Sequence, residues 1–245
     1  MIIIASDFDG TLNYHGISEA DKNAIEKFRQ EGNKFGVVTG RDLEQALWVI
    51  YDLKKANLTV DFVICCTGAV RLTGDGEIVR VTKQRVGKYL NEILEYARTI
   101  DVGTFRASNE LVVCFADPRA KIEQPFSAIS EMTQSNAWFP NEDDAERFVQ
   151  YVRKNHANDI SIFRNGGSID MPPVGISKVS GIYEYASQFE NAKIVTVGDN
   201  VNDIPMIKEF DGYAVSNAKD ELKEIANHHC DRIADMIEEI MKGNI

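Results

Sequence analysis

Three short apolar runs, far apart in the chain, each end in polar side chains. Residues 1–5 lead into Ser6-Asp7-Phe8-Asp9-Gly10-Thr11, residues 35–38 into Thr39-Gly40-Arg41, and residues 194–197 into Gly198-Asp199-Asn200-Val201-Asn202-Asp203. Buried parallel strands read as continuous apolar runs, and open α/β sheets bind ligands beyond the carboxyl ends of their strands. The pattern therefore predicts a parallel sheet that gathers the three polar clusters at one edge.

The charge balance limits the classes of partner. The 245 residues carry a formal net charge of −11, which disfavours nucleic-acid binding because phosphate backbones attract basic surfaces. The four cysteines form no Cys-x-x-Cys pair, and no segment reads as a signal peptide or a membrane span. We expect a reduced, cytoplasmic protein without nucleic-acid or membrane partners, either a monomer or a homodimer.

Strand and helix patterns alternate over the first eighty residues and again from Ser177 onward. The first region predicts strands and helices in turn, followed by a hairpin at 70–81; the strands fall near 2–7, 34–39 and 61–66, and the helices near 18–31 and 42–56. Ser18 is the expected N-cap of the first helix. This alternation is typical of an α/β fold with a doubly wound, mainly parallel, Rossmann-like sheet.

Residues 82–172 interrupt that alternation. They predict helices near 84–100, 122–134 and 143–155, and two hairpins built from strands at 103–107 with 110–116 and at 159–164 with 167–171. Hairpins combined with helices indicate an α+β unit rather than further βαβ layers. We predict a Rossmann-like core formed by residues 1–81 and 173–245, and a smaller α+β cap domain inserted at 82–172.

Asp7 and Asp9 are separated by one residue at the end of the first run. Residues two apart in a strand point to the same face, so the two carboxylates are expected close together. Their repulsion is about 4 kcal/mol at roughly 4 Å and an effective dielectric of about 20, and a bound Mg²⁺ removes it. Asp7 can then attack phosphorus to form an aspartyl phosphate, while Asp9 serves as proton donor and acceptor. A solvated Asp-Gly turn is the alternative.

The second cluster offers groups for an anion. Thr39 supplies a hydroxyl, and Gly40 supplies a backbone N–H near the start of a predicted helix, where phosphate groups bind. A capping threonine followed by a turn glycine explains the same residues without a ligand. Arg41 either reaches the substrate or points into solvent.

The third cluster and a nearby lysine complete the candidate set. Asp199 is the expected direct metal ligand; Asn202 and Asp203 are expected to orient water, the metal or Lys178, with direct ligation by Asp203 as an alternative. The other interpretation is an N-capping cluster of Asn and Asp. Lys178 would attract a phosphoryl oxygen by about 4 kcal/mol at a distance of roughly 4 Å.

These motifs, in this order, resemble those of the haloacid dehalogenase superfamily of phosphohydrolases. Asp7-Phe8-Asp9-Gly10-Thr11-Leu12 is similar to its nucleophile motif, Thr39 to its second motif, Lys178 to its third, and Asp199 with Asp203 to its acidic fourth. The long insertion between the second and third motifs is similar to that of the Cof-type branch, whose α+β cap closes over sugar phosphates and other small phosphate esters. The resemblance spans nearly the whole chain.

The resemblance implies a cofactor and roles for individual residues. It implies Mg²⁺ held by Asp7, Asp199 and the backbone carbonyl of Asp9, and phosphate bound by Thr39, Gly40 and Lys178. Members of the branch often carry Asn-Gly-Ala after the third strand, where this chain has Thr67-Gly68-Ala69, so the role of Thr67 is open. The cap residues Arg106, Arg164 and Asn165 are candidate substrate contacts because of their positions in the predicted hairpins.

The leading hypothesis is a Mg²⁺-dependent phosphatase that acts on a small phosphorylated metabolite, such as a sugar phosphate. A phosphomutase that returns the phosphoryl group to another hydroxyl of the sugar is the alternative within the same fold. A regulatory phosphoacceptor of the response-regulator type is disfavoured, because receivers lack an inserted domain of this size and carry the acceptor aspartate in mid-domain.

Overall fold

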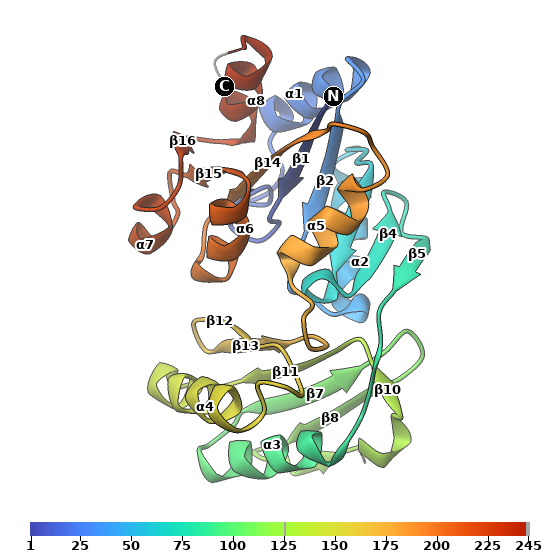
Figure 1. Cartoon of the computed structure of the whole chain (residues 1–245), viewed down its shortest axis with the longest axis vertical. Helices are drawn as coiled ribbons and strands as arrows, with labels where there is room; N and C mark the ends of the chain where they lie inside the picture. The colour runs from blue at the N-terminus through green and yellow to red at the C-terminus, as the bar shows by residue number, and fades with distance from the viewer. Residues whose placement is uncertain (125, 244–245) are drawn as a thin grey trace.

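The computed structural model describes residues 1–124 and 126–243. The chain forms two bodies stacked along its long axis, and both ends of the chain lie at the end of the larger body that is farthest from the smaller one (Figure 1). No helix in the described ranges is long and apolar enough to cross a membrane.

The larger body is built on an eight-stranded sheet within the described residues. Its strands, in spatial order, are β16 (His228–Cys230), β15 (Asp211–Val215), β14 (Lys193–Gly198), β1 (Ile2–Ser6), β2 (Lys34–Val38), β3 (Phe62–Cys65), β4 (Val70–Thr73) and β5 (Ile78–Val81). The first six run parallel, and β4 and β5 pair antiparallel at the edge. Ser6 lies opposite Val197 and Val37, so the three loops that carry the predicted site residues leave the sheet at one level.

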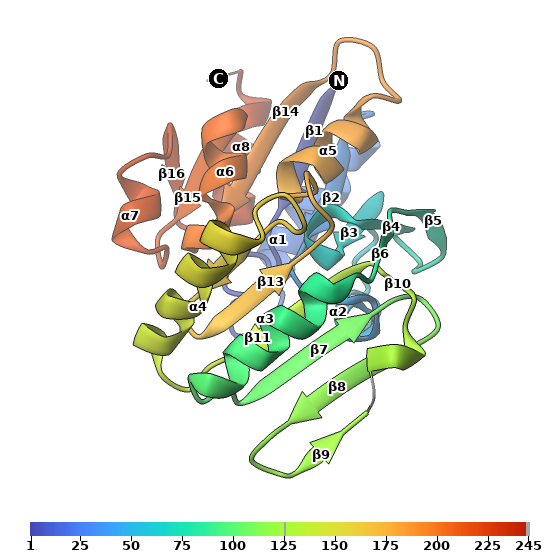
Figure 2. The same ribbon diagram turned by 60° about the horizontal axis from the view of Figure 1, so that its bottom comes forward.

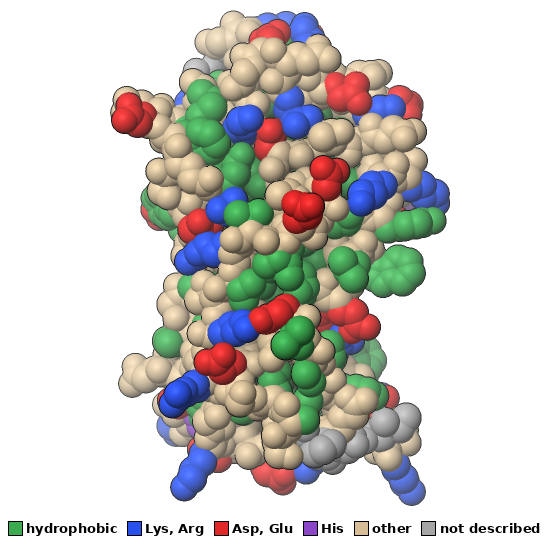
Figure 3. Space-filling view, turned by 90° about the vertical axis from the view of Figure 1, so that its right-hand side faces the viewer, with side chains coloured by type: hydrophobic (Ala, Val, Ile, Leu, Met, Phe, Trp, Pro, Cys, Tyr) green, Lys and Arg blue, Asp and Glu red, His purple; other side chains and the backbone are tan. Residues whose placement is uncertain are grey.

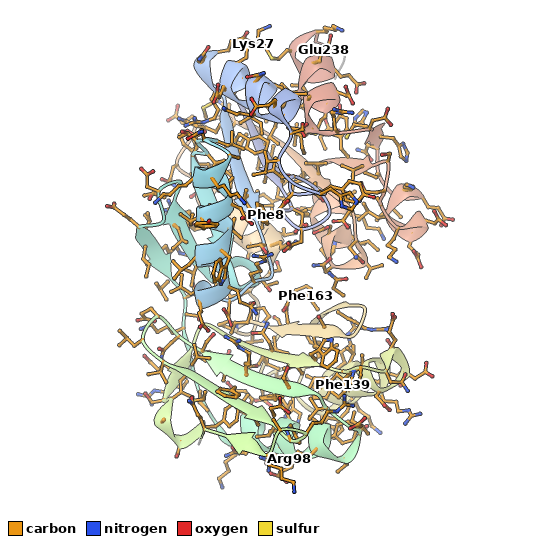
Figure 4. The ribbon with its side chains drawn as sticks, turned by 180° about the vertical axis from the view of Figure 1, so that it is seen from behind. Phe8, Lys27, Arg98, Phe139, Phe163 and Glu238 are labelled. Carbon is orange, nitrogen blue, oxygen red and sulfur yellow. The ribbon has the colours of Figure 1, made fainter. Side chains whose placement is uncertain are left out.

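Helices cover both faces of this sheet, as a doubly wound fold requires. The helices α1 (Glu19–Gln30), α2 (Leu43–Lys55) and α8 (Ile233–Met241) lie on one face; α5 (Lys178–Ala186) and α6 (Ile204–Glu209) lie on the other, and α7 (Asp220–Lys223) follows β15 (Figures 1 and 4). The 3-10 turns η1 (Cys66–Gly68) and η3 (Val201–Asp203) sit at the ends of β3 and β14. The predicted α/β class and the Ser18 N-cap are confirmed: the Ser18 hydroxyl accepts from Asp21 N at 3.1 Å.

The smaller body carries a separate antiparallel sheet and a separate core. Its strands, in spatial order, are β12 (Phe163–Asn165), β13 (Ser168–Met171), β11 (Gln134–Trp138), β7 (Thr104–Ser108), β8 (Val113–Asp117) and β9 (Ile122–Glu123). The helices α3 (Lys88–Thr99) and α4 (Glu142–Asn155) cover the face turned away from the larger body (Figure 2). Phe105 and Phe139, together with Phe148 of α4, are buried in the core of this body. We call this body the cap.

The prediction of a helix near 122–134 is wrong. The segment holds β9, the 3-10 turn η2 (Phe126–Ala128) and β10 (Glu131–Met132), and β11 begins at Gln134; residue 125 lies outside the described residues. Glu131 is exposed and Met132 is buried, an alternation that suits a strand. The segment forms strands because β10 pairs with β6 (Gln84–Arg85) and β11 pairs with β7. These pairings give the backbone N–H and C=O groups of the segment hydrogen-bond partners from distant parts of the chain.

The open face of the cap sheet is turned toward the carboxyl ends of the parallel strands. Phe8, at the end of β1, and Phe163, on β12, lie on the two sides of this junction (Figure 4). On the side of β4 and β5, hydrophobic side chains gather at the level where the two bodies meet (Figure 3). The cap thus forms one wall of whatever site lies at the strand ends.

Candidate active site

A buried lysine joins two carboxylates at the centre of this junction. Lys178 is the first residue of α5, and its Nζ lies 2.5 Å from Asp7 Oδ1 and 2.6 Å from Asp203 Oδ1. Ser177 caps the helix and accepts from Ser180 N, which fixes the direction in which Lys178 leaves the backbone. Asp7 follows β1, and its N–H donates to Val197 O on β14 at 2.9 Å. The sheet therefore brings together residues that are more than 170 positions apart.

Burial and like charge shift the pKa values of this group. Burial, with the nearby Asp203 carboxylate, raises the pKa of Asp7 well above its usual range, although Lys178 opposes the shift. Burial also disfavours the charge on Lys178, but Asp203 and Asp7 outweigh it and raise the pKa of the ammonium. One ammonium faces more carboxylates than it can neutralise, so the site has room for a further positive charge.

Asp199 lies beside this cluster on the loop after β14. Thr11 donates to Asp199 Oδ1 at 2.9 Å, and burial together with Asp203 raises the pKa of Asp199 to about 6. Asp203 is fully buried; its Oδ2 accepts from the N–H groups of Asp199 and Asn200, both at 3.2 Å. Both oxygens of Asp203 are thus engaged, which leaves Asp7 and Asp199 as the more open carboxylates.

These residues fit a magnesium ion. Carboxylate oxygens of Asp7, Asp199 and Asp203 lie within 4.8 Å of one another. Gly10 makes room for the loop: its φ is +83°, and a Cβ there would stand 2.4 Å from Asp199 Oδ2. Asn202 Oδ1 is buried without a hydrogen-bond partner among the described residues. Hard oxygen donors and uncompensated negative charge suit Mg²⁺.

The loop after β2 brings Thr39, Gly40 and Arg41 to the same edge. Thr39 is 2% exposed, and its hydroxyl oxygen accepts from Arg41 N–H at 3.2 Å. The Arg41 guanidinium binds Asp9 through two hydrogen bonds of 2.8 and 2.7 Å. Arg41 therefore turns into the site, and it occupies the Asp9 carboxylate there.

A cavity of about 190 Å³ connects these groups. It is lined by both bodies, and its walls are Asp7, Asp9, Thr39, Gly40, Arg41, Gln45, Asn165, Ser168, Asp170, Asp199, Asn200 and Asn202. Of the cap residues predicted from the sequence, Asn165 reaches this cavity. Arg164 instead binds Glu142, Glu146 and the Gly166 carbonyl within the cap.

Arg106 also lies outside the cavity. Its Nη2 is 2.9 Å from Asp42 Oδ2 and 2.7 Å from Glu44 Oε2, so it joins the cap to the start of α2. Four residues that line the cavity were not predicted as site residues: Gln45, Ser168, Asp170 and Asn200. Asp170 could have been predicted from the sequence, because aspartate is uncommon inside strands and its presence in one suggests a specific role.

Asp170 is a cap carboxylate that comes close to the predicted phosphate loop. A Cβ on Gly40 would stand 2.2 Å from Asp170 Oδ2, so the glycine permits this close approach. Asn136 donates to Asp170 Oδ1 at 2.7 Å. Burial raises the pKa of Asp170 to about 7 in spite of that hydrogen bond.

Sequence comparisons relate the chain to hydrolases. The profile of the haloacid dehalogenase-like hydrolases matches residues 4–236. The 5-amino-6-(5-phospho-D-ribitylamino)uracil phosphatase YcsE of Bacillus subtilis is 26% identical over 240 residues, which cover 94% of this chain and 89% of the relative. MG263 of Mycoplasma genitalium, which is named as a phosphatase, is 24% identical over 248 residues, which cover 88% of this chain and 77% of that protein.

Solved structures share the whole architecture. A haloacid dehalogenase-like hydrolase from B. subtilis superposes with a TM-score of 0.79 at 18% identity, covering 98% of this chain and all of the other. The subclass IIB sugar phosphatase BT4131 gives a TM-score of 0.79 at 20% identity and full coverage of both chains. At these identities the likeness shows the fold, cap included.

Proposed function

This chain belongs to the haloacid dehalogenase-like hydrolase family and is a phosphoric monoester hydrolase, and we propose that it cleaves small phosphate esters through an aspartyl phosphate with the help of Mg²⁺. The observation that carries the proposal is the convergence of Asp7, Asp199, Thr39 and Lys178 on one buried edge of the sheet. A phosphoryl group needs a nucleophile, a cation and hydrogen-bond donors at such a place.

Asp7 is the proposed nucleophile. Lys178 holds its Oδ1, so Oδ2 is the oxygen available to attack phosphorus. As the new oxygen–phosphorus bond forms, the ester bond to phosphorus breaks and the leaving oxygen takes a proton from Asp9. Asp9 then accepts a proton from the water that attacks the aspartyl phosphate, which releases phosphate and restores Asp7. Because Arg41 occupies Asp9, proton delivery requires Arg41 to exchange Asp9 for the substrate.

Asp7, Asp199 and the backbone carbonyl of Asp9 would hold the ion, which supplies positive charge for the transferring group. Asp203 would orient Lys178 and the Asp199 backbone rather than bind the ion, because it is fully buried and does not line the cavity, whereas Asp7 and Asp199 do. Thr39, Gly40 and Lys178 would bind the phosphoryl oxygens. Asn202, with its unpartnered Oδ1, would orient a water near the ion.

The leaving group is proposed to be a small hydroxyl-rich molecule such as a sugar. The far wall of the cavity is polar rather than apolar, with Gln45, Asn165, Ser168 and Asp170. Such side chains bind hydroxyl groups through hydrogen bonds. A cavity of about 190 Å³ suits a small leaving group.

Replacement of Asp7 tests this proposal. We expect Asp7→Asn to abolish phosphate release from p-nitrophenyl phosphate and from a panel of sugar phosphates in Mg²⁺, because an amide cannot attack phosphorus. The exposed Asp235→Asn variant, which removes the same charge far from the site, serves as the control. Undiminished turnover by Asp7→Asn would refute the nucleophile assignment. Conversion of a hexose phosphate to an isomer without free phosphate would identify a mutase instead.

A further inference from the structure

The cap contributes a side chain to the backbone of the proposed phosphate loop. Gln134, the first residue of β11, is fully buried between the two bodies. Its Nε2 donates to the Gly40 carbonyl at 2.7 Å, and its Oε1 accepts from the Thr67 hydroxyl at 3.0 Å. One cap amide therefore holds two core loops at once.

The core itself satisfies the other two carbonyls of this loop. Thr39 O accepts from Thr67 N–H at 3.2 Å, and Arg41 O accepts from Cys66 N–H at 2.8 Å. Within the part of the chain that the structure describes, the Gly40 carbonyl is bound by Gln134 alone. The conformation of the loop is thus complete only when the cap is closed.

A planar peptide carries this contact to the Thr39 hydroxyl. In a trans peptide, the Gly40 C=O and the Arg41 N–H point in opposite directions, so fixing one fixes the other. The Arg41 N–H donates to Thr39 Oγ1 at 3.2 Å. An oxygen that already accepts this bond directs its own O–H elsewhere, which makes it a donor for a phosphoryl oxygen.

The backbone around Thr67 indicates that this contact is specified by the fold. Cys66 and Thr67 adopt φ values of +52° and +53°, a left-handed conformation that is costly for a β-branched residue. The conformation directs the Thr67 hydroxyl to the cap amide, and the Thr67 N–H to the Thr39 carbonyl. Thr67 thereby contacts the amide oxygen of Gln134 and does not line the cavity.

We propose that Gln134 is a positioning residue: by binding the Gly40 carbonyl, it orients the Thr39 hydroxyl toward phosphate only when the cap is closed. The inference rests on the proposed function, in which Thr39 binds the phosphoryl group. It makes cap closure and assembly of the phosphate site a single event. Loss of the contact should weaken the binding of the phosphoryl group equally in the ground state and in the transition state.

Three variants separate this role from simple tethering of the cap. Gln134→Ala removes both hydrogen bonds. Gln134→Glu keeps the shape and an acceptor for Thr67, and in its ionised form it loses the donor to Gly40. Thr67→Val removes the hydroxyl and leaves the Gly40 contact intact. The measurements are kcat and KM for p-nitrophenyl phosphate in Mg²⁺, the inhibition constant of inorganic phosphate, and the melting temperature.

We expect both Gln134 variants to raise the inhibition constant of phosphate and the KM about tenfold, the usual effect of one lost hydrogen bond to a buried group, with kcat changed much less. Thr67→Val should change the inhibition constant less than about threefold. An unchanged inhibition constant in both Gln134 variants would overturn the inference, whether or not the melting temperature falls. Equal effects in all three variants would also overturn it, because they indicate tethering. If the wild-type protein hydrolyses no ester, it is the proposed function that fails.

Discussion

At the scale of single residues, the site is dominated by carboxyl groups that folding takes out of water. Asp7 and Asp199 have raised pKa values on the core side, and Asp170 has one near 7 on the cap side. Lys178 is the buried cation that contacts Asp7 and Asp203. Such a cluster lowers stability in exchange for function, because each unpaired buried charge is costly.

The variant Asp170→Asn tests how much the buried carboxyl group of the cap lowers the stability of the protein. A carboxyl whose pKa rises from 3.8 to about 7 on folding binds its proton more tightly in the folded state, so stability falls as pH rises across that window. The amide does not titrate. We expect the stability of the variant, relative to the wild type, to grow between pH 5 and pH 8 by on the order of 2 to 4 kcal/mol.

Urea unfolding of the two proteins at several pH values, in a metal chelator, measures this difference. The comparison cancels the contributions of Asp7 and Asp199, which both proteins share. A difference in unfolding free energy that stays constant from pH 5 to pH 8 would show that Asp170 titrates normally.

At the scale of elements, helix starts place polar groups at the strand ends. Lys178 is the first residue of α5, and Asp42 caps α2 while it binds Arg106 of the cap. The same capping chemistry operates at α1, where the Ser18 hydroxyl accepts from Asp21 N–H. Local sequence therefore sets where these helices begin.

Ser18→Ala is expected to lower the free energy of unfolding by about 1 kcal/mol, because it leaves a helix N–H without its acceptor. Ser18→Gly should cost only a few tenths of a kcal/mol, since glycine is itself tolerated at N-caps. Chemical denaturation with Mg²⁺-dependent turnover as a parallel readout checks both variants. An unchanged free energy of unfolding in Ser18→Ala would mean that the hydrogen bond from Asp21 N–H to the Ser18 hydroxyl does not stabilise the protein.

At the scale of the whole molecule, the two bodies have separate cores and meet at the site. Clustered carboxylates in the larger body oppose its folding, so an ion that binds them should stabilise the protein. A ligand that binds only the folded state adds about 2.7 kcal/mol at 100 times its dissociation constant.

We therefore expect saturating Mg²⁺ to raise the melting temperature of the wild-type protein by several degrees, and a chelator to reverse the rise. Asp199→Asn should lose most of the effect, while Asp235→Asn, on the exposed face of α8, should keep it. Calorimetry at constant ionic strength makes the comparison. A rise of equal size in both variants would place the ion elsewhere.

The fold class and the strands that carry the predicted site residues follow from the amino-acid sequence alone. Buried parallel strands must be apolar throughout, so the runs that end at Asp7, Thr39 and Asp199 identify both the strands and their functional ends. The N-cap at Ser18 and the predicted hairpins likewise depend on residues that are close together in the sequence. The boundaries at 81–82 and 172–173, and the roles of the site residues, remain predictions.

Which cap residues reach the cavity depends on contacts between distant segments of the chain. Arg106 and Arg164 were expected there from hairpin position, but nearby carboxylates bind both, and Asp170 and Gln134 approach the loop instead. The segment 122–134 became strands for a related reason, because its partners lie elsewhere in the chain. The local sequence pattern predicts the hydrogen bonds and burial that a segment can achieve with its own neighbouring residues. Contacts between distant segments depend on how two separate cores are packed, and no local pattern records that.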